Sequence, residues 1–138
     1  MKAEELMIGD WVFDKAVSDK PVQILQINAC NVHYEHENGY TSVGVELLEP
    51  VPITAEILEK NGFRTRDKDK EYTGTLMYHL YKELDPDVCL LGVLWYIKNS
   101  EAEISLNYSP CWIIIKYVHQ LQHVLRLCGL EKEIKFED

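Results

Sequence analysis

The chain has 138 residues, of which 46 % are hydrophobic and 27 % are charged, and its formal net charge is −9. This length and composition are typical of one globular domain or two small units, which need neither a metal nor disulfides to fold. The acidic balance argues against nucleic acid as a partner, because Lys and Arg must neutralise the phosphates along its backbone.

The cysteines and the N-terminal residues indicate a cytoplasmic protein. The four cysteines lie far apart, form no CxxC motif and fall in or beside apolar runs, so buried free thiols are expected. The first ten residues, MKAEELMIGD, carry charge where a signal peptide would be apolar. The longest apolar run is also too short to span a membrane, so we expect no membrane association.

The first 52 residues read as short strands joined by tight turns. Strands are expected over 6–13, 21–28, 31–36 and 41–48. Gly9-Asp10 interrupts the first of them, and Asn38-Gly39 is a strong hairpin signal before the last. This pattern predicts a small, SH3-like antiparallel barrel over residues 1–52.

Residues 53–138 are expected to form a second subdomain, in which a β-meander is covered by the C-terminal helix. Helices are expected over 55–61 and 117–128, and strands over about 72–82, 88–97, 102–108 and 112–116. The segment 88–97 is apolar on both faces, so it should be a central strand covered on both sides. The predicted fold class is α+β, with both subdomains sharing one core.

Turns and ends of this second part are also predicted. Asp85-Pro86-Asp87 and Ser109-Pro110 have the composition of turns, and the mixed-charge run 64–71 that of a solvated loop. Gly129 is placed to stop the C-terminal helix in a left-handed conformation. The last residues, 133–136, could add a short edge strand.

Two histidine pairs are candidate metal ligands. His119 and His123 are four residues apart and therefore lie on one helix face, as two ligands would. HQLQH lacks the glutamate of HExxH, and a site would still need a third ligand. His33 and His36 alternate between the faces of a strand. We therefore assign no metal, cofactor or catalytic residue, and a position at the edge of the apolar stripe is the simpler interpretation of His119 and His123.

Three strings resemble a group of short uncharacterised proteins from Bacteroides-type gut bacteria, their phages and mobile elements. IKYVHQLQHVLRLCGLE (115–131) is similar to that group's ending, YVHQLQNLYF.LTGEEL. LMIGDWV (6–12) and LEPVPITAEILEKNGF (48–63) resemble its R-IGN-V and -PIPLTEEWL-K-GF strings. Cys128-Gly129-Leu130 departs from the usual threonine-glycine-glutamate. The resemblance implies a small bacterial or phage-borne cytoplasmic protein, and it implies no activity or catalytic residues.

The polar members of the shared VHQLQ string and its neighbour form a candidate interaction corner. These residues are Tyr117, His119, Gln120 and Gln122. In one interpretation they cap the junction between strand and helix and satisfy backbone groups there. In the other they form a binding surface for a peptide or small ligand.

Three functional hypotheses follow. The first is a non-enzymatic binding or adaptor protein that acts by protein–protein contact, because no catalytic set is found and small acidic barrels often serve in interactions. The second is a metal-dependent or other enzyme that uses His119, His123 and an acid. The third is a nucleic-acid-associated accessory protein, which the net charge disfavours. Exposed edge strands would also permit a homodimer.

Overall fold

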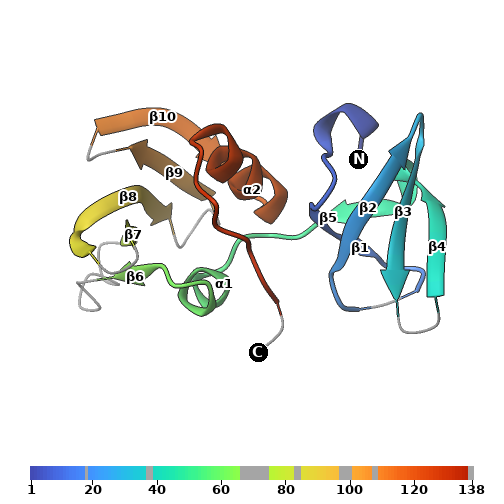
Figure 1. Ribbon diagram of the computed structural model, residues 1–138, viewed down its shortest axis with the longest axis horizontal. Coiled ribbons are helices and arrows are strands. Elements are labelled where there is room, and N and C mark those ends of the chain that lie inside the picture. Colours follow the sequence, from blue (N-terminus) through green and yellow to red (C-terminus); the bar gives the residue numbers. More distant parts are fainter. Residues whose placement is uncertain are drawn as a thin grey trace. The chain divides into compact units, whose positions relative to one another are not determined.

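The computed structural model describes residues 1–17, 19–36, 39–65, 75–82, 85–96, 101–106 and 109–136 (Figure 1). The fold is α+β, with two five-stranded antiparallel sheets and one main helix near the C-terminus. The backbone contacts divide the chain into two compact units. Unit 1 comprises Met1–Val51 and Tyr117–Glu131, and unit 2 comprises Pro52–Lys116 and Lys132–Asp138.

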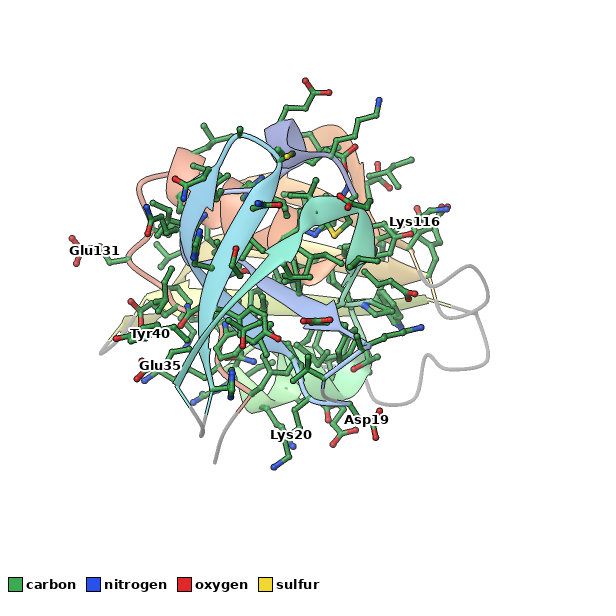
Figure 2. The ribbon with its side chains drawn as sticks, turned by 90° about the vertical axis from the view of Figure 1, so that its right-hand side faces the viewer. Asp19, Lys20, Glu35, Tyr40, Lys116 and Glu131 are labelled. Atoms are coloured by element: carbon green, nitrogen blue, oxygen red, sulfur yellow. The ribbon has the colours of Figure 1, made fainter. Side chains whose placement is uncertain are left out.

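Unit 1 contains the first sheet and the C-terminal helix. Its elements are η1 (Ala3–Glu5), β1 (Trp11–Asp14), β2 (Val22–Asn28), β3 (Asn31–His36), β4 (Gly39–Gly44), η2 (Val45–Leu47), β5 (Leu48–Pro50) and α2 (Val118–Leu127). The strand order is β4-β3-β2-β1-β5, so the sheet is open at β4 and β5. Glu35 and Tyr40 face each other across β3 and β4 (Figure 2).

The core of unit 1 is built by residues of β1, β2, β3 and β5, together with two residues outside the strands. It consists of Leu6, Val12, Val22, Ile24, Val32, Tyr34, Val45 and Leu48. The alternating burial of β1 and the first half of β2 and β3 is what a half-buried strand requires. This part of the chain therefore has a core of its own.

Two of the strands predicted in unit 1 have different bounds in the structure. The strand expected over 6–13 starts only at Trp11, because Gly9 adopts a left-handed φ of 93° and Asp10 N–H closes a turn on Met7. The strand expected over 41–48 is two strands, separated by η2, where Val45 N–H binds the carbonyl of Cys30. The strand over 31–36 is confirmed.

Unit 2 contains the second sheet and a short helix. Its elements are α1 (Ala55–Lys60), β6 (Arg64–Thr65), β7 (Thr75–Lys82), β8 (Asp85–Tyr96), β9 (Glu101–Leu106) and β10 (Ser109–Ile115). The strand order is β10-β9-β8-β7-β6, and all pairs are antiparallel. The predicted meander is therefore confirmed. The helix over 117–128, however, groups by its contacts with unit 1 rather than with this meander.

Two predicted turns of unit 2 are strand residues. Asp85-Pro86-Asp87 starts β8, and Ser109-Pro110 starts β10, because the backbone pairing of the hairpins extends past both prolines. Both prolines lie beside register shifts, where the loss of one backbone donor is tolerated. Parts of the predicted strands and loop, at 66–74, 97 and 107–108, lie outside the described residues.

The two faces of the second sheet differ in burial. On one face a row of paired residues crosses four strands, Ile113, Ile104, Val93 and Tyr78, and the last three are fully buried. The neighbouring row on the other face is Ile114, Glu103, Leu94 and Met77. In that row Ile114 is 62 % and Met77 38 % exposed, and Leu94 is partly exposed. The cover expected on both sides of the 88–97 segment is thus complete on one side only.

Helix α1 ends in a clamp that holds the C-terminal segment. Thr54 caps the start of the helix, accepting the N–H of Ile57 at 3.2 Å. At the other end, buried Asn61 donates its amide to the carbonyls of Ile57 (2.9 Å) and Lys135 (3.0 Å). Its amide oxygen accepts Lys135 N–H at 2.7 Å. The edge strand expected over 133–136 is therefore not a strand, because a side chain takes up its backbone groups.

No helix in the described ranges is both long and apolar enough to cross a membrane.

Candidate functional site

Helix α2 carries all the residues singled out in the VHQLQ string, and its ends are set by local hydrogen bonds. At the start, Tyr117 is extended and its N–H is accepted by the side chain of Gln120 at 3.2 Å. At the end, Gly129 is left-handed (φ 70°), and Leu130 N–H reaches the carbonyl of Leu125 at 2.9 Å. The bond between Leu130 N–H and the carbonyl of Leu125 is that of a Schellman motif, so the helix end predicted at Gly129 is confirmed.

A buried carboxylate in unit 1 joins the turn before β1 to this helix. Asp10 is 0 % exposed, and its carboxylate accepts three hydrogen bonds. Met7 N–H and His123 Nε2 donate to Oδ2 at 2.8 and 2.7 Å, and Arg126 Nη1 donates to Oδ1 at 3.0 Å. Burying a carboxylate costs several kcal/mol unless such donors replace its water shell, and Arg126 also supplies the opposite charge.

Gln122 makes a second link between the same turn and the helix. Its amide nitrogen donates to the carbonyl of Gly9 at 2.9 Å, and its amide oxygen accepts Trp11 N–H at 3.0 Å. Gln23 of β2 also donates to Gly9, at 2.9 Å. The side chain of Gln122 is thus satisfied by backbone groups on both sides of Asp10.

His119 occupies the inner side of this corner. It is 4 % exposed, its ring stacks on Tyr117 with centroids 5.9 Å apart, and the ring of His123 meets it edge-on at 5.7 Å. Its buried Nδ1 has no hydrogen-bond partner among the described residues. Burial lowers the pKa of His119 below its ordinary value, and the charge of Asp10 opposes that shift only in part. The ring is therefore held neutral by burial.

The four residues predicted as an interaction corner have different surroundings. Gln120 and Gln122 bind backbone groups, and His119 is buried, which supports a structural use of these three side chains. Tyr117 is partly exposed and stacks on His119. What remains for a ligand at this corner is the exposed part of the Tyr117 and His123 rings.

Of the two candidate pairs of metal ligands, only His119 and His123 come together. Among the residues described, no group of three or more His, Cys, Asp or Glu side chains is placed to hold a metal ion. His119 and His123 are neighbours, and Nε2 of His123 is taken by Asp10. On β3, His33 accepts from Asn28 and His36 pairs with Thr41, so these two histidines are not brought together. An imidazole held by a carboxylate can act as a general base, but Arg126 here shares that carboxylate.

A second buried carboxylate was not anticipated from the sequence. Asp14, at the end of β1, accepts the hydroxyl of Tyr34 at 2.6 Å and the N–H of Ala16 at 3.3 Å. Burial, reinforced by this hydrogen bond and the charge of Asp14, raises the pKa of Tyr34 to about 12. The pair ties β1 to β3 through the core of unit 1. Asp14 also follows the alternation of β1, in which Val12 and Asp14 face inward.

None of the cysteines whose side chains the structure describes is in a disulfide. These are Cys30, Cys89 and Cys128, and Cys111 belongs to β10. Cys89 is buried as expected, whereas Cys30 is exposed because it lies in the turn between β2 and β3 rather than in a strand.

The partly exposed face of the second sheet is the other candidate site. Beside the row of Ile114, Glu103, Leu94 and Met77, the Tyr96 hydroxyl donates to Glu103 Oε2 at 2.8 Å. That hydrogen bond raises the pKa of Tyr96. Aromatic residues and Met are enriched at protein interfaces. We call this row, with Tyr96, the open face of unit 2.

No protein-family model, curated protein or solved structure matches this chain.

Proposed function

We propose that this is a non-enzymatic binding protein whose contact surface for a protein partner is the open face of unit 2. The proposal rests on strand β8, whose sequence predicts burial on both faces although only one face is fully buried. The strand is apolar on both faces, which is typical of strands buried on both sides. Val93 and Trp95 are buried on one face, but Leu94 on the other is only partly covered.

The exposed apolar side chains of this face share one row of paired residues. Met77, Leu94 and Ile114 lie in one row across β7, β8 and β10, interrupted by Glu103 on β9. Scattered exposed apolar residues need no explanation, whereas several of them in one row across a sheet are typical of a surface that another molecule covers. A carboxylate within the row gives such a contact a polar point of specificity.

Three further assignments belong to this proposal. The first sheet is taken as an SH3-like barrel that is left open, which the order β4-β3-β2-β1-β5 and the single turn η2 between β4 and β5 support. The similarity of the VHQLQ-containing ending supports membership of the Bacteroides-type bacterial and phage group. The third assignment is a cytoplasmic location, which the absence of a disulfide at Cys30, Cys89 and Cys128 supports.

The test is capture of a partner by immobilised full-length protein from the lysate of a Bacteroides-type bacterium, repeated with Met77→Lys. Leu127→Lys is the matched control, since Leu127 on α2 is an apolar side chain that is 87 % exposed. We expect a partner that binds the wild type and L127K and is lost with M77K, and whose binding is reproduced with both proteins purified. Equal capture by all three, or turnover in a substrate screen with no partner found, would contradict the proposal.

A further inference from the structure

Strand β10 is an edge of the second sheet, and it is the least protected edge of the described chain. It pairs with β9 on one side, and the strand order places no described strand on the other. Immediately after the strand, Ile53 N–H binds the carbonyl of Lys116 at 2.9 Å, so the open part of this edge ends at Ile115. An unpaired edge presents a row of N–H and C=O groups that can accept another strand. The other three edges are shorter or more polar: β6 has two residues with exposed Arg64, β5 has three with Glu49 and Pro50, and the six-residue β4 contains Thr41 and Ser42.

The second half of β10 lacks the devices that usually protect an edge. Pro110 and a register shift occupy its first half, before Ile113. Ile113–Ile115 then carries three β-branched apolar residues without a charge, and Ile113 and Ile114 are 44 % and 62 % exposed. Lys116 follows, but Glu101 holds its ammonium group at 3.0 Å. Short uncharged β-branched edges of this kind pair readily with further strands.

The charge distribution of the chain indicates which molecule can approach this edge. The net charge is −9, yet residues 104–130 contain no Asp or Glu and include Lys116 and Arg126. A second, equally acidic copy therefore meets β10 without placing carboxylates against carboxylates. Identical strands that pair antiparallel are related by a two-fold axis, which is the symmetry of the commonest homo-oligomers.

We propose that a second copy of this chain pairs antiparallel with β10 through Ile113–Ile115. With the axis at Ile114, that side chain lies opposite its own copy, and Ile113 lies opposite Ile115 of the partner. The two Lys116 residues then lie at opposite ends of the paired segment, so their charges stay apart. This contact uses the backbone edge of the sheet at Ile113–Ile115, and it shares only the Ile114 side chain with the open face proposed as the partner site.

The experiment is sedimentation equilibrium of the full-length protein from about 1 µM to about 200 µM, the range that reveals a weak dimer. We expect a dimer for the wild type and at least a tenfold higher dissociation constant for Ile114→Lys. Leu127→Lys adds the same charge to an exposed apolar side chain elsewhere and should leave the constant unchanged. Met77→Lys, on an interior strand of the same sheet face, should also leave it unchanged.

Three outcomes would overturn the inference: a monomeric wild type at the highest concentration, a dimer unaffected by I114K, or equal loss with M77K, which indicates packing through the face. If I114K loses the wild-type circular dichroism, Ile114→Thr replaces it, because threonine keeps the β-branched shape and removes apolar surface. A monomeric wild type would overturn the dimer without affecting the proposed binding function. A dimer that M77K leaves unchanged would support the edge pairing whether or not a protein partner is found.

Discussion

At the scale of single residues, the least expected feature is a fully buried carboxylate that joins a turn to a helix distant in sequence. Asp10 lies more than a hundred residues before Arg126 in the sequence, and a charge-assisted hydrogen bond joins the two side chains. Buried ion pairs contribute little net stability but are costly to break, since the remaining partner loses its counter-charge. The cluster therefore determines how the turn and α2 pack within unit 1.

Replacing Asp10 should reveal this cost. Asp10→Ala removes three hydrogen bonds and leaves Met7 N–H without its acceptor, although Arg126 and His123 are partly exposed and can regain water. We expect the free energy of unfolding to fall by about 2–4 kcal/mol, measured by urea denaturation. Asp19→Ala, at an exposed site, should change it by less than about 0.5 kcal/mol. Equal effects of the two substitutions would show that the cluster has no special role.

His119 gives unit 1 a pH dependence whose sign follows from its burial. Burial lowers the folded-state pKa of His119 below the ordinary value of 6.5, so between these two values the unfolded chain binds more protons. Stability should therefore be retained above pH 6.5 and decrease as the pH falls below it. In His119→Gln this part of the pH dependence should vanish, so the difference in unfolding free energy between variant and wild type should change with pH below 6.5. A pH-independent difference would contradict the assignment.

At the scale of elements, the hydrophobic pattern predicted most of the helices and strands because their burial is one-sided. The helix at 117–128, the strand at 31–36 and the short helix at 55–61 were all placed within a residue or so. The errors arose where backbone pairing overrides local composition, as at Asp85–Asp87, which the sequence marks as a turn and the structure pairs with β7.

The Asp10 site was missed because its members are far apart in sequence. One signal was present on the helix alone. His119, Gln122, His123 and Arg126 follow the spacing i, i+3, i+4, i+7, which forms a polar line beside the apolar stripe. Such a line, two of whose members are buried, requires buried polar partners. Nothing in the sequence, however, identifies Asp10 rather than another acid as that partner.

The clamp at the end of α1 makes a prediction about the C-terminal segment. Asn61→Asp keeps an oxygen to accept Lys135 N–H but loses the amide donors to Ile57 and Lys135. We expect the free energy of unfolding to fall by about 1–3 kcal/mol, because a buried side chain loses its donors and gains a charge. Hydrogen exchange of the Lys135 amide should accelerate at the same time. Unchanged exchange would show that buried Ile134 alone holds the segment.

At the scale of the whole molecule, neither unit is one continuous stretch of chain. Unit 1 needs α2, which follows unit 2's sheet in sequence, and unit 2 includes the residues after Glu131. A division at residue 52, as the composition suggests, would separate Asp10 from Arg126 and His123 and leave a buried carboxylate without its charged donor. Each unit is therefore completed by a segment near the C-terminus.

The overall charge also makes a prediction about self-association. Two copies that each carry −9 repel one another at long range, while the proposed contact at β10 is apolar and free of acidic residues. Salt shortens the Debye length from about 30 Å at 0.01 M to about 8 Å at 0.15 M, which weakens the repulsion and leaves apolar burial intact. The dissociation constant of the dimer should therefore fall about threefold or more over this range, as measured by sedimentation equilibrium. Weaker association at higher salt would instead indicate ion pairs across the contact, with Lys116 facing carboxylates of the other copy, and the apolar edge pairing would have to be abandoned.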